Sequence, residues 1–194
     1  MSVSTIVVKR IRRIPKGRPF GIDQFVNAGS RGAVAKTFSR LAESGELVRL
    51  TRGIYMRPKF SRFAGDVRPS IYSVLRIIAR RNREIIQMHG AEAVRSFGLS
   101  TQMQVQPVFY TSGKSRKVKV GKTCVQLLHV SSRKLQHAGT NVGLALSALF
   151  YTGKKGVDQI VISRIRAKMT PSEFEQLADS DIPNWMRVAL RQEN

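Results

Sequence analysis

The sequence predicts an α+β protein in two parts, a helical part that ends in a short hairpin and a longer part that mixes helices and strands. Apolar residues recur at helical spacing in several segments, and short β-branched runs lie between glycines. The stretch around residues 58–69 combines proline and glycine with no clear period. We therefore expect one domain at 1–59, a linker at 60–69 and a second domain at 70–194.

The first part is expected to form a compact set of helices followed by two strands. Pro15 ends the first helix, Ser30 provides an N-cap oxygen for the third, and Gly45 terminates that helix. Gly53 supplies the positive φ that a tight hairpin needs. The elements expected are helices at 3–14, 20–28 and 31–44 and strands at 47–50 and 54–56.

The second part is expected to hold a small antiparallel sheet surrounded by helices. Glycine turns at Gly113 and Gly121 separate β-branched runs, and Pro171 and Pro183 lie where the last two helices begin. The elements expected are strands at 84–88, 105–111, 116–120 and 123–130 and helices at 71–78, 91–97, 142–151, 157–165 and after each of the two prolines.

The composition indicates a polyanionic partner. The 194 residues include 34 Lys and Arg but 12 Asp and Glu, so the formal net charge is +22. A surface this positive attracts polyanions, of which nucleic acid is the commonest. Hydrophobic residues make up 42%, enough for a packed core. A lone cysteine, Cys124, and apolar runs too short to cross a bilayer fit a cytoplasmic protein without a membrane partner.

The element order of the first part is that of a winged helix-turn-helix, whose recognition helix enters the DNA major groove. Arginine can hold guanine through two hydrogen bonds, whereas lysine and threonine side chains suit phosphates. The wing residues would hold an adjacent backbone or the minor groove. An alternative is that these charges are only a solvated face. The expected DNA contacts are Ser30, Arg31, Ala33, Lys36, Thr37 and Arg40 on the helix and Arg49, Arg52 and Arg57 on the wing.

A second basic cluster surrounds two of the strands expected in the second part. It consists of Lys114, Arg116, Lys117, Lys119 and Lys122. One interpretation is a second nucleic-acid contact that extends the DNA footprint. The other is a solvated edge strand that its lysines protect from aggregation. The pattern of residues leaves both open.

No catalytic residue, metal site or cofactor is expected. Cys124, His129 and His137 match no zinc-ligand spacing. His89 precedes a short helix and is expected to be a surface or cap residue. The few carboxylates suit a two-metal nuclease poorly, so the sequence favours a protein that is not an enzyme.

The segment Ser44–Tyr55, with the sequence SGELVRLTRGIY, resembles the winged-helix signature of AbiEi-type antitoxins. These antitoxins belong to bacterial type IV toxin–antitoxin and phage-abortive-infection systems. Further similarity lies in FGLST at 97–101, in PVFYTSG at 107–113 and in IPNWM at 182–186.

The resemblance implies that the first domain binds inverted repeats in its own promoter, with paired copies on the DNA, and represses transcription. The second domain would counteract a nucleotidyltransferase-like toxin, with or without direct contact. The alternative is an RNA-binding structural or ribosome-associated protein, which the size and charge suggest. Patterned apolar faces throughout the chain, and strand aromatics limited to Phe109 and Tyr110, favour the DNA-binding interpretation.

Overall fold

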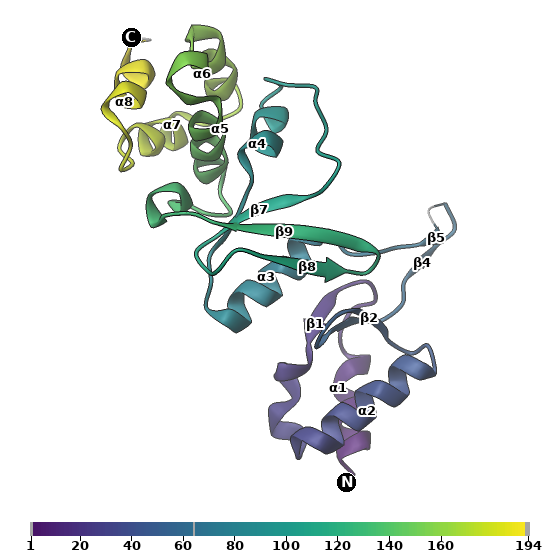
Figure 1. The fold of residues 1–194 in the computed structure, drawn as a ribbon. Helices are drawn as coiled ribbons and strands as arrows, with labels where there is room; N and C mark the ends of the chain where they lie inside the picture. Colours follow the sequence, from purple (N-terminus) through teal and green to yellow (C-terminus); the bar gives the residue numbers. More distant parts are fainter. Residues whose placement is uncertain (1, 64, 193–194) are drawn as a thin grey trace. The chain divides into compact units, whose positions relative to one another are not determined.

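The computed structural model describes residues 2–63 and 65–192 and confirms the α+β class (Figure 1). The chain forms two compact units. The first runs to Asn82 and includes Lys119–Thr123, and the second takes Arg83–Val118 and the chain from Cys124 onward. This division differs from the predicted boundary at 60–69.

The first unit begins with helices and a three-stranded sheet of order β1-β3-β2. The helices predicted at 3–14 and 31–44 and the two hairpin strands are confirmed, and Gly53 has the expected positive φ of 74°. Its elements are α1 (Val3–Arg12), β1 (Pro19–Gly21), the 3-10 helix η1 (Ile22–Ala28), α2 (Arg31–Glu43), β2 (Val48–Thr51), β3 (Ile54–Met56), β4 (Phe60–Ser61), β5 (Gly65–Asp66) and α3 (Ile71–Asn82).

The start of the predicted helix at 20–28 is wrong, because its first residues form β1. Phe20 lies opposite Tyr55 in an antiparallel pair with β3. Both rings are buried and contact Phe38 of α2, at centroid distances of 6.3 Å for Phe20 and 5.0 Å for Tyr55. Tyr55 is therefore a core residue.

Residues 60–69 are not a plain linker. Phe60 pairs with Asp66 and Ser61 with Gly65, so the chain folds back into a two-stranded ribbon. The helix α3 that follows belongs to the first unit, where it contacts β1. Its Val74 and Leu75 side chains are fully buried, and leaving them in solvent would be costly.

After α3, helices accompany a four-stranded sheet of order β6-β7-β9-β8. β6 and β7 are antiparallel, but β7 and β9 are parallel, so a purely antiparallel sheet was the wrong prediction. In the sequence β8 lies between β7 and β9 and runs opposite to both, so β9 has the same direction as β7. The elements are β6 (Ile86–Met88), α4 (Gly90–Ser96), β7 (Val108–Thr111), β8 (Arg116–Val120), β9 (Thr123–His129), the 3-10 helix η2 (Ser132–Leu135), α5 (Asn141–Gly156), α6 (Gln159–Arg166), α7 (Pro171–Ala178) and α8 (Asn184–Arg191).

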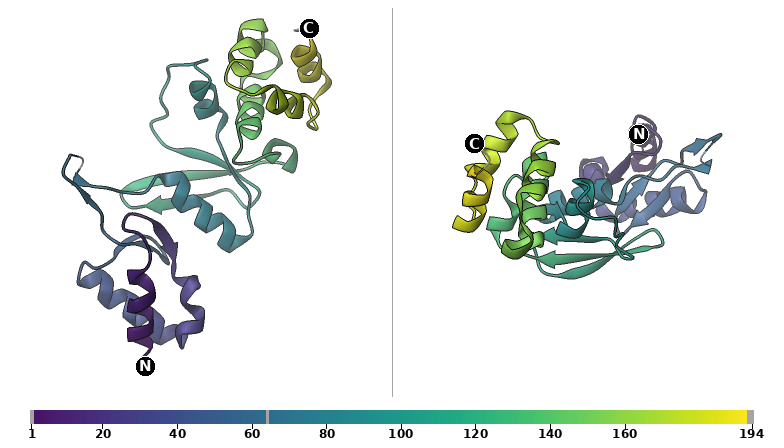
Figure 2. Two further views of the ribbon diagram at one scale, coloured as in Figure 1. Left: turned by 180° about the vertical axis from the view of Figure 1, so that it is seen from behind. Right: turned by 90° about the horizontal axis from the view of Figure 1, so that it is seen from above.

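Close packing of α4 against α5 forms the centre of the second unit, and both views in Figure 2 place these helices side by side. Ala93 of α4 and Phe97, the C-cap residue of that helix, share a buried cluster with Leu146 and Leu149 of α5. The approach is closest at Gly90, where an added Cβ would lie 2.2 Å from the Tyr151 Cβ and 2.7 Å from the Ser147 carbonyl oxygen. Glycine is therefore required at this position by contact distance.

His89 is the N-cap of α4, as the sequence predicts. Its Nδ1 accepts a hydrogen bond from the backbone N–H of Ala91 at 3.2 Å. The imidazole lies 4.8 Å from the Tyr110 ring and 5.5 Å from the Tyr151 ring, between centroids. Burial lowers the pKa of His89 from its ordinary value of 6.5. The folded state thus favours the neutral ring.

Replacing Gly90 with alanine is expected to destabilise the protein by about 1–3 kcal/mol, because the new methyl group overlaps α5. Gly32→Ala in α2 is the matched control, since an added Cβ there meets nothing within 4 Å. It is expected to be neutral or to stabilise by less than about 1 kcal/mol. Urea unfolding of the two variants measures the difference, and equal midpoints would contradict the packing argument.

His89 is expected to make stability depend on pH. Because its pKa is lower in the folded than in the unfolded state, its contribution is complete above pH 6.5 and is lost as the pH falls through the lowered value. His89→Asn keeps an N-cap acceptor but does not titrate. Melting temperatures between about pH 7 and pH 5.5 should therefore fall less in the variant than in the wild type, and equal slopes would rule this role out.

Candidate nucleic-acid interface

The exposed side of α2 carries cations because its other side is fixed in the core. Val34, Phe38 and Leu41 are buried, at steps of four and three residues. The Ser30 hydroxyl accepts a hydrogen bond from the Ala33 N–H at 3.3 Å, so the predicted N-cap is confirmed. The burial of one face of α2 therefore determines which of its side chains are exposed to solvent.

Arg31 and Lys36 lie on that exposed side. Within residues 2–63 and 65–192, neither charged group forms a hydrogen bond or an ion pair with another side chain. Ala33, between them in sequence, is half-buried. Arg31 lies in the first turn of α2, where the backbone N–H groups also carry partial positive charge, and Lys36 lies in the middle of the helix, so this exposed side is locally positive.

Two of the residues expected on this face lie elsewhere. Thr37 is only 5% exposed, and its hydroxyl donates to the Ala33 carbonyl oxygen at 2.9 Å. It satisfies its polar atom within the helix and cannot reach a ligand. Arg40 lies in the last turn of α2, not in its N-terminal half, and its guanidinium donates to the Ser4 hydroxyl of α1.

The hairpin β2–β3 presents Arg49 and Arg52 to solvent, as expected. The backbone of its turn is held in place from two sides. The Gly53 carbonyl oxygen accepts from the Ile22 N–H at 2.9 Å, and the Arg52 carbonyl oxygen accepts from the Arg81 guanidinium at 3.3 Å. Two hydrogen bonds therefore hold the backbone of the turn in place, next to the exposed guanidiniums of Arg49 and Arg52.

Arg57 is not a wing-tip residue. Its guanidinium donates to the carbonyl oxygens of Arg12 and Ile14, at 2.8 and 2.9 Å. These carbonyl groups lie at the C-terminal end of α1, where helix backbone oxygens lack partners within the helix and the dipole favours a cation. The expected DNA contact at Arg57 is thus replaced by a capping role.

The second basic cluster lies on β8, the edge strand of its sheet, with Lys114 just before the strand and Lys122 in the turn after it. Lys114, Lys117, Lys119 and Lys122 are exposed. Arg116 instead points inward and forms an ion pair with Glu84, whose side chain is 14% exposed. Four of the five predicted cations are therefore available to solvent, in the arrangement that also protects an edge strand from pairing.

An exposed aromatic hairpin, which the sequence patterns did not predict, lies in the expected linker. Phe60 of β4 is 75% exposed and Phe63, in the turn, is 100% exposed. Lys59 and Arg62 beside them are exposed as well. Aromatic faces next to cations are the means by which proteins stack unpaired bases. The signal in the sequence was that Phe60 follows Lys59 and Phe63 follows Arg62.

The residues considered for chemistry do not assemble into a reactive site. His129 hydrogen-bonds through Nδ1 with the Gly113 carbonyl oxygen at 2.9 Å, and Cys124 is an exposed free thiol. Among the described residues, no three His, Cys, Asp or Glu side chains are grouped so as to hold a metal ion. In that same part of the chain, no helix combines the length and apolar character needed to cross a membrane.

Arg57→Ala is expected to lower the free energy of unfolding by about 1–2 kcal/mol, because two helix-end carbonyl groups lose a charged donor. Arg52→Ala, which removes an exposed side chain, serves as the matched control and should change stability by less than about 0.5 kcal/mol. Thermal or urea unfolding distinguishes the two. Equal stability of both variants would show that Arg57 has no capping role.

Comparison with known proteins identifies one family. No curated protein matches this chain. The family model described as "Family of unknown function (DUF6088)" matches residues 6–177, which cover most of both compact units and all of α2, β8 and α5. This match covers most of the 194 residues. The chain is therefore a member of the DUF6088 family.

Proposed function

We propose that this protein is a double-stranded DNA-binding regulator whose first unit is a winged helix-turn-helix. The observation that carries the proposal is the order α1, β1, η1, α2, β2, β3 together with the sheet order β1-β3-β2 and free cations on α2. In this arrangement η1 and α2 are the helix-turn-helix, and β2–β3 is the wing.

In the proposed complex α2 lies in the major groove. Arg31 in its first turn reads a guanine edge, and Lys36 holds a phosphate. Arg49 and Arg52, which flank an anchored turn, contact the neighbouring backbone or the minor groove. Thr37 and Arg57 take no part, since both polar groups are satisfied within the protein. Two copies would bind the two halves of an inverted repeat.

We further propose that the protein is a cytoplasmic AbiEi-type antitoxin that represses its own operon and is not an enzyme. The support is the resemblance of Ser44–Tyr55 and of the segments at 97–101, 107–113 and 182–186. The second unit would counteract a nucleotidyltransferase-like toxin. Co-expression of the whole chain with the neighbouring gene tests the antitoxin proposal. Growth arrest caused by that gene and not relieved by this protein would contradict it.

RNA binding is the second candidate function, and one observation favours it. Phe60 and Phe63 expose their rings beside Lys59 and Arg62, in the manner of single-strand stacking platforms. In this case the aromatic hairpin, rather than α2, would be the main contact. The two candidates predict different preferred nucleic acids.

Fluorescence-anisotropy titrations at about 150 mM salt separate these functions. The probes are the gene's own upstream duplex, a scrambled duplex and a structured RNA of equal length. Preference for the upstream duplex by about 10³-fold or more is expected for specific DNA binding. Equal and steeply salt-dependent affinities for all three would mean that net charge alone drives binding, and a preference for RNA would favour the second candidate.

The double variant Arg31→Gln/Lys36→Gln is expected to weaken binding to the upstream duplex by roughly 1–3 kcal/mol or more, since a base contact and a phosphate contact are lost. Lys154→Gln/Lys155→Gln, at the end of α5, removes the same charge from two other exposed residues. Its affinity should stay near the wild-type value. Equal losses in the two variants would remove α2 from the mechanism.

A further inference from the structure

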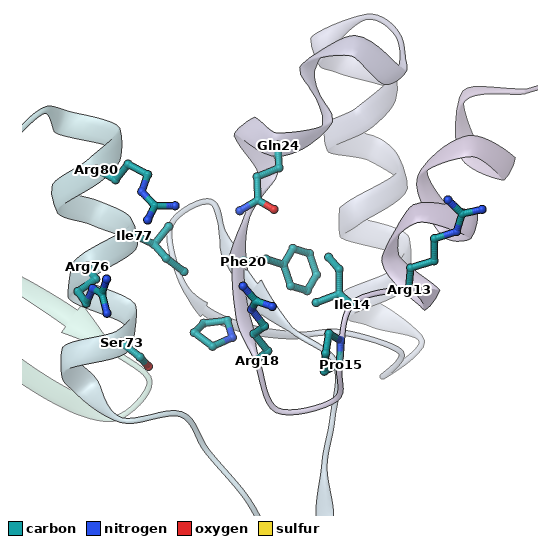
Figure 3. A pocket seen from close by; sticks show the side chains of 11 residues that line it. Arg13, Ile14, Pro15, Arg18, Phe20, Gln24, Ser73, Arg76, Ile77 and Arg80 are labelled. Atoms are coloured by element: carbon teal, nitrogen blue, oxygen red, sulfur yellow. The ribbon is translucent and has the colours of Figure 1, made fainter.

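A cavity of about 480 Å³ lies within the first unit, on the side formed by the end of α1, β1, η1 and α3 (Figure 3). Four of the side chains that line it are arginines, namely Arg13, Arg18, Arg76 and Arg80. Arg76 and Arg80 project from α3 and are one helical turn apart, so they share a face of that helix. Figure 3 shows them across the cavity from Phe20, Gln24 and Arg18.

The charge of this cavity is not compensated. No carboxylate lines it, and the four guanidiniums form no ion pair within the described part of the chain. Like charges brought together in a concavity raise the free energy of the unliganded state, because the walls exclude part of the screening solvent. An anion bound there would relieve this repulsion and accept charge-assisted hydrogen bonds from several arginines.

The floor of the cavity is apolar. The Phe20 ring, only 2% exposed, lies there with Ile14 and Ile77. Gln24 and Ser73 add neutral hydrogen-bonding groups at its edge. The volume lies in the range of small-molecule sites. Several fixed cations over an apolar floor suit a ligand that has both a highly charged group and a less polar body, as a nucleoside polyphosphate has.

Regular elements form two sides of the cavity, whereas Arg13 and Arg18 lie on the segment between α1 and β1. β1 carries Phe20 and is fixed by its register with β3, in which Phe20 faces Tyr55. α3 contacts β1, and its Ser73, Arg76 and Ile77 side chains line the cavity together with Phe20. The two arginines of α3 and the floor are therefore kept in a constant relation, which is what a binding site requires.

We propose that this arginine cavity, defined by Arg13, Arg18, Arg76 and Arg80, binds a phosphate-bearing anion. The phosphates would come from a free nucleotide or from a nucleic-acid backbone, and the chemistry of recognition is the same in both. The role is separate from that of α2 in the proposed function. It would make the first unit responsive to a second anionic ligand.

The test uses the full-length protein with ATP, inorganic pyrophosphate and adenosine as probes, by isothermal titration calorimetry at about 150 mM salt. Arg76→Gln/Arg80→Gln removes two cavity cations. Arg187→Gln/Arg191→Gln on α8 is the matched control, with the same spacing and the same change in charge. Arg18→Gln, on the opposite wall, is a second and independent cavity variant. Circular dichroism confirms that each variant is folded, and a generic duplex is titrated in parallel.

If the ligand is a free nucleotide, ATP and pyrophosphate should bind the wild type and the α8 variant with equal affinity. Both cavity variants should bind them about tenfold or more weakly. Adenosine should not bind, and the affinity for the duplex should be unchanged. For a nucleic-acid backbone, the cavity variants should instead lower duplex affinity and reduce the salt slope by about 1–2. The proposal is overturned when cavity and control variants behave alike in every titration.

Discussion

Four aromatic rings, each from a different element, hold the first unit together. Phe20 of β1, Phe25 of η1, Phe38 of α2 and Tyr55 of β3 lie with centroids 5.0–6.3 Å apart, mostly tilted or edge-to-face. Aromatic pairs in such geometry are worth about 0.5–1.5 kcal/mol each beyond the area they bury. The rest of the unit depends on this cluster, because it fixes α2 relative to the sheet and thereby decides which of its side chains meet solvent.

The same constraint determines which polar side chains are exposed and which form hydrogen bonds within the fold. Turning Phe38 inward also buries Thr37, its neighbour in sequence, but leaves Arg31 and Lys36 free. Arg57 follows directly after β3 and reaches the open end of α1, where it serves the fold instead of a ligand. In the second unit the contact of Gly90 with α5 has a similar organising role, since it sets how closely the two helices pack.

Much of the fold could be predicted from local patterns, such as the Ser30 cap and the stripe of Val34, Phe38 and Leu41. What could not be predicted depends on partners distant in sequence. β1 forms only because Phe20 pairs with Tyr55, and Arg57 has a role only because α1 ends beside it. The arginine cavity is lined by residues of the segment between α1 and β1, of β1, of η1 and of α3, so no single segment of the sequence predicts it.

The three ion pairs found among the described residues, Arg95–Glu92, Arg116–Glu84 and Arg133–Asp181, all lie outside the first unit. The cations of the first unit outnumber its carboxylates and therefore repel one another on balance, and dissolved salt should weaken this repulsion. Salt also weakens attachment to polyanions. Folding and binding thus respond to ionic strength in opposite senses. At low salt the free protein is least stable, whereas the proposed binding to a polyanion is strongest. A bound polyanion would therefore stabilise the folded state and protect it from proteases most at low salt.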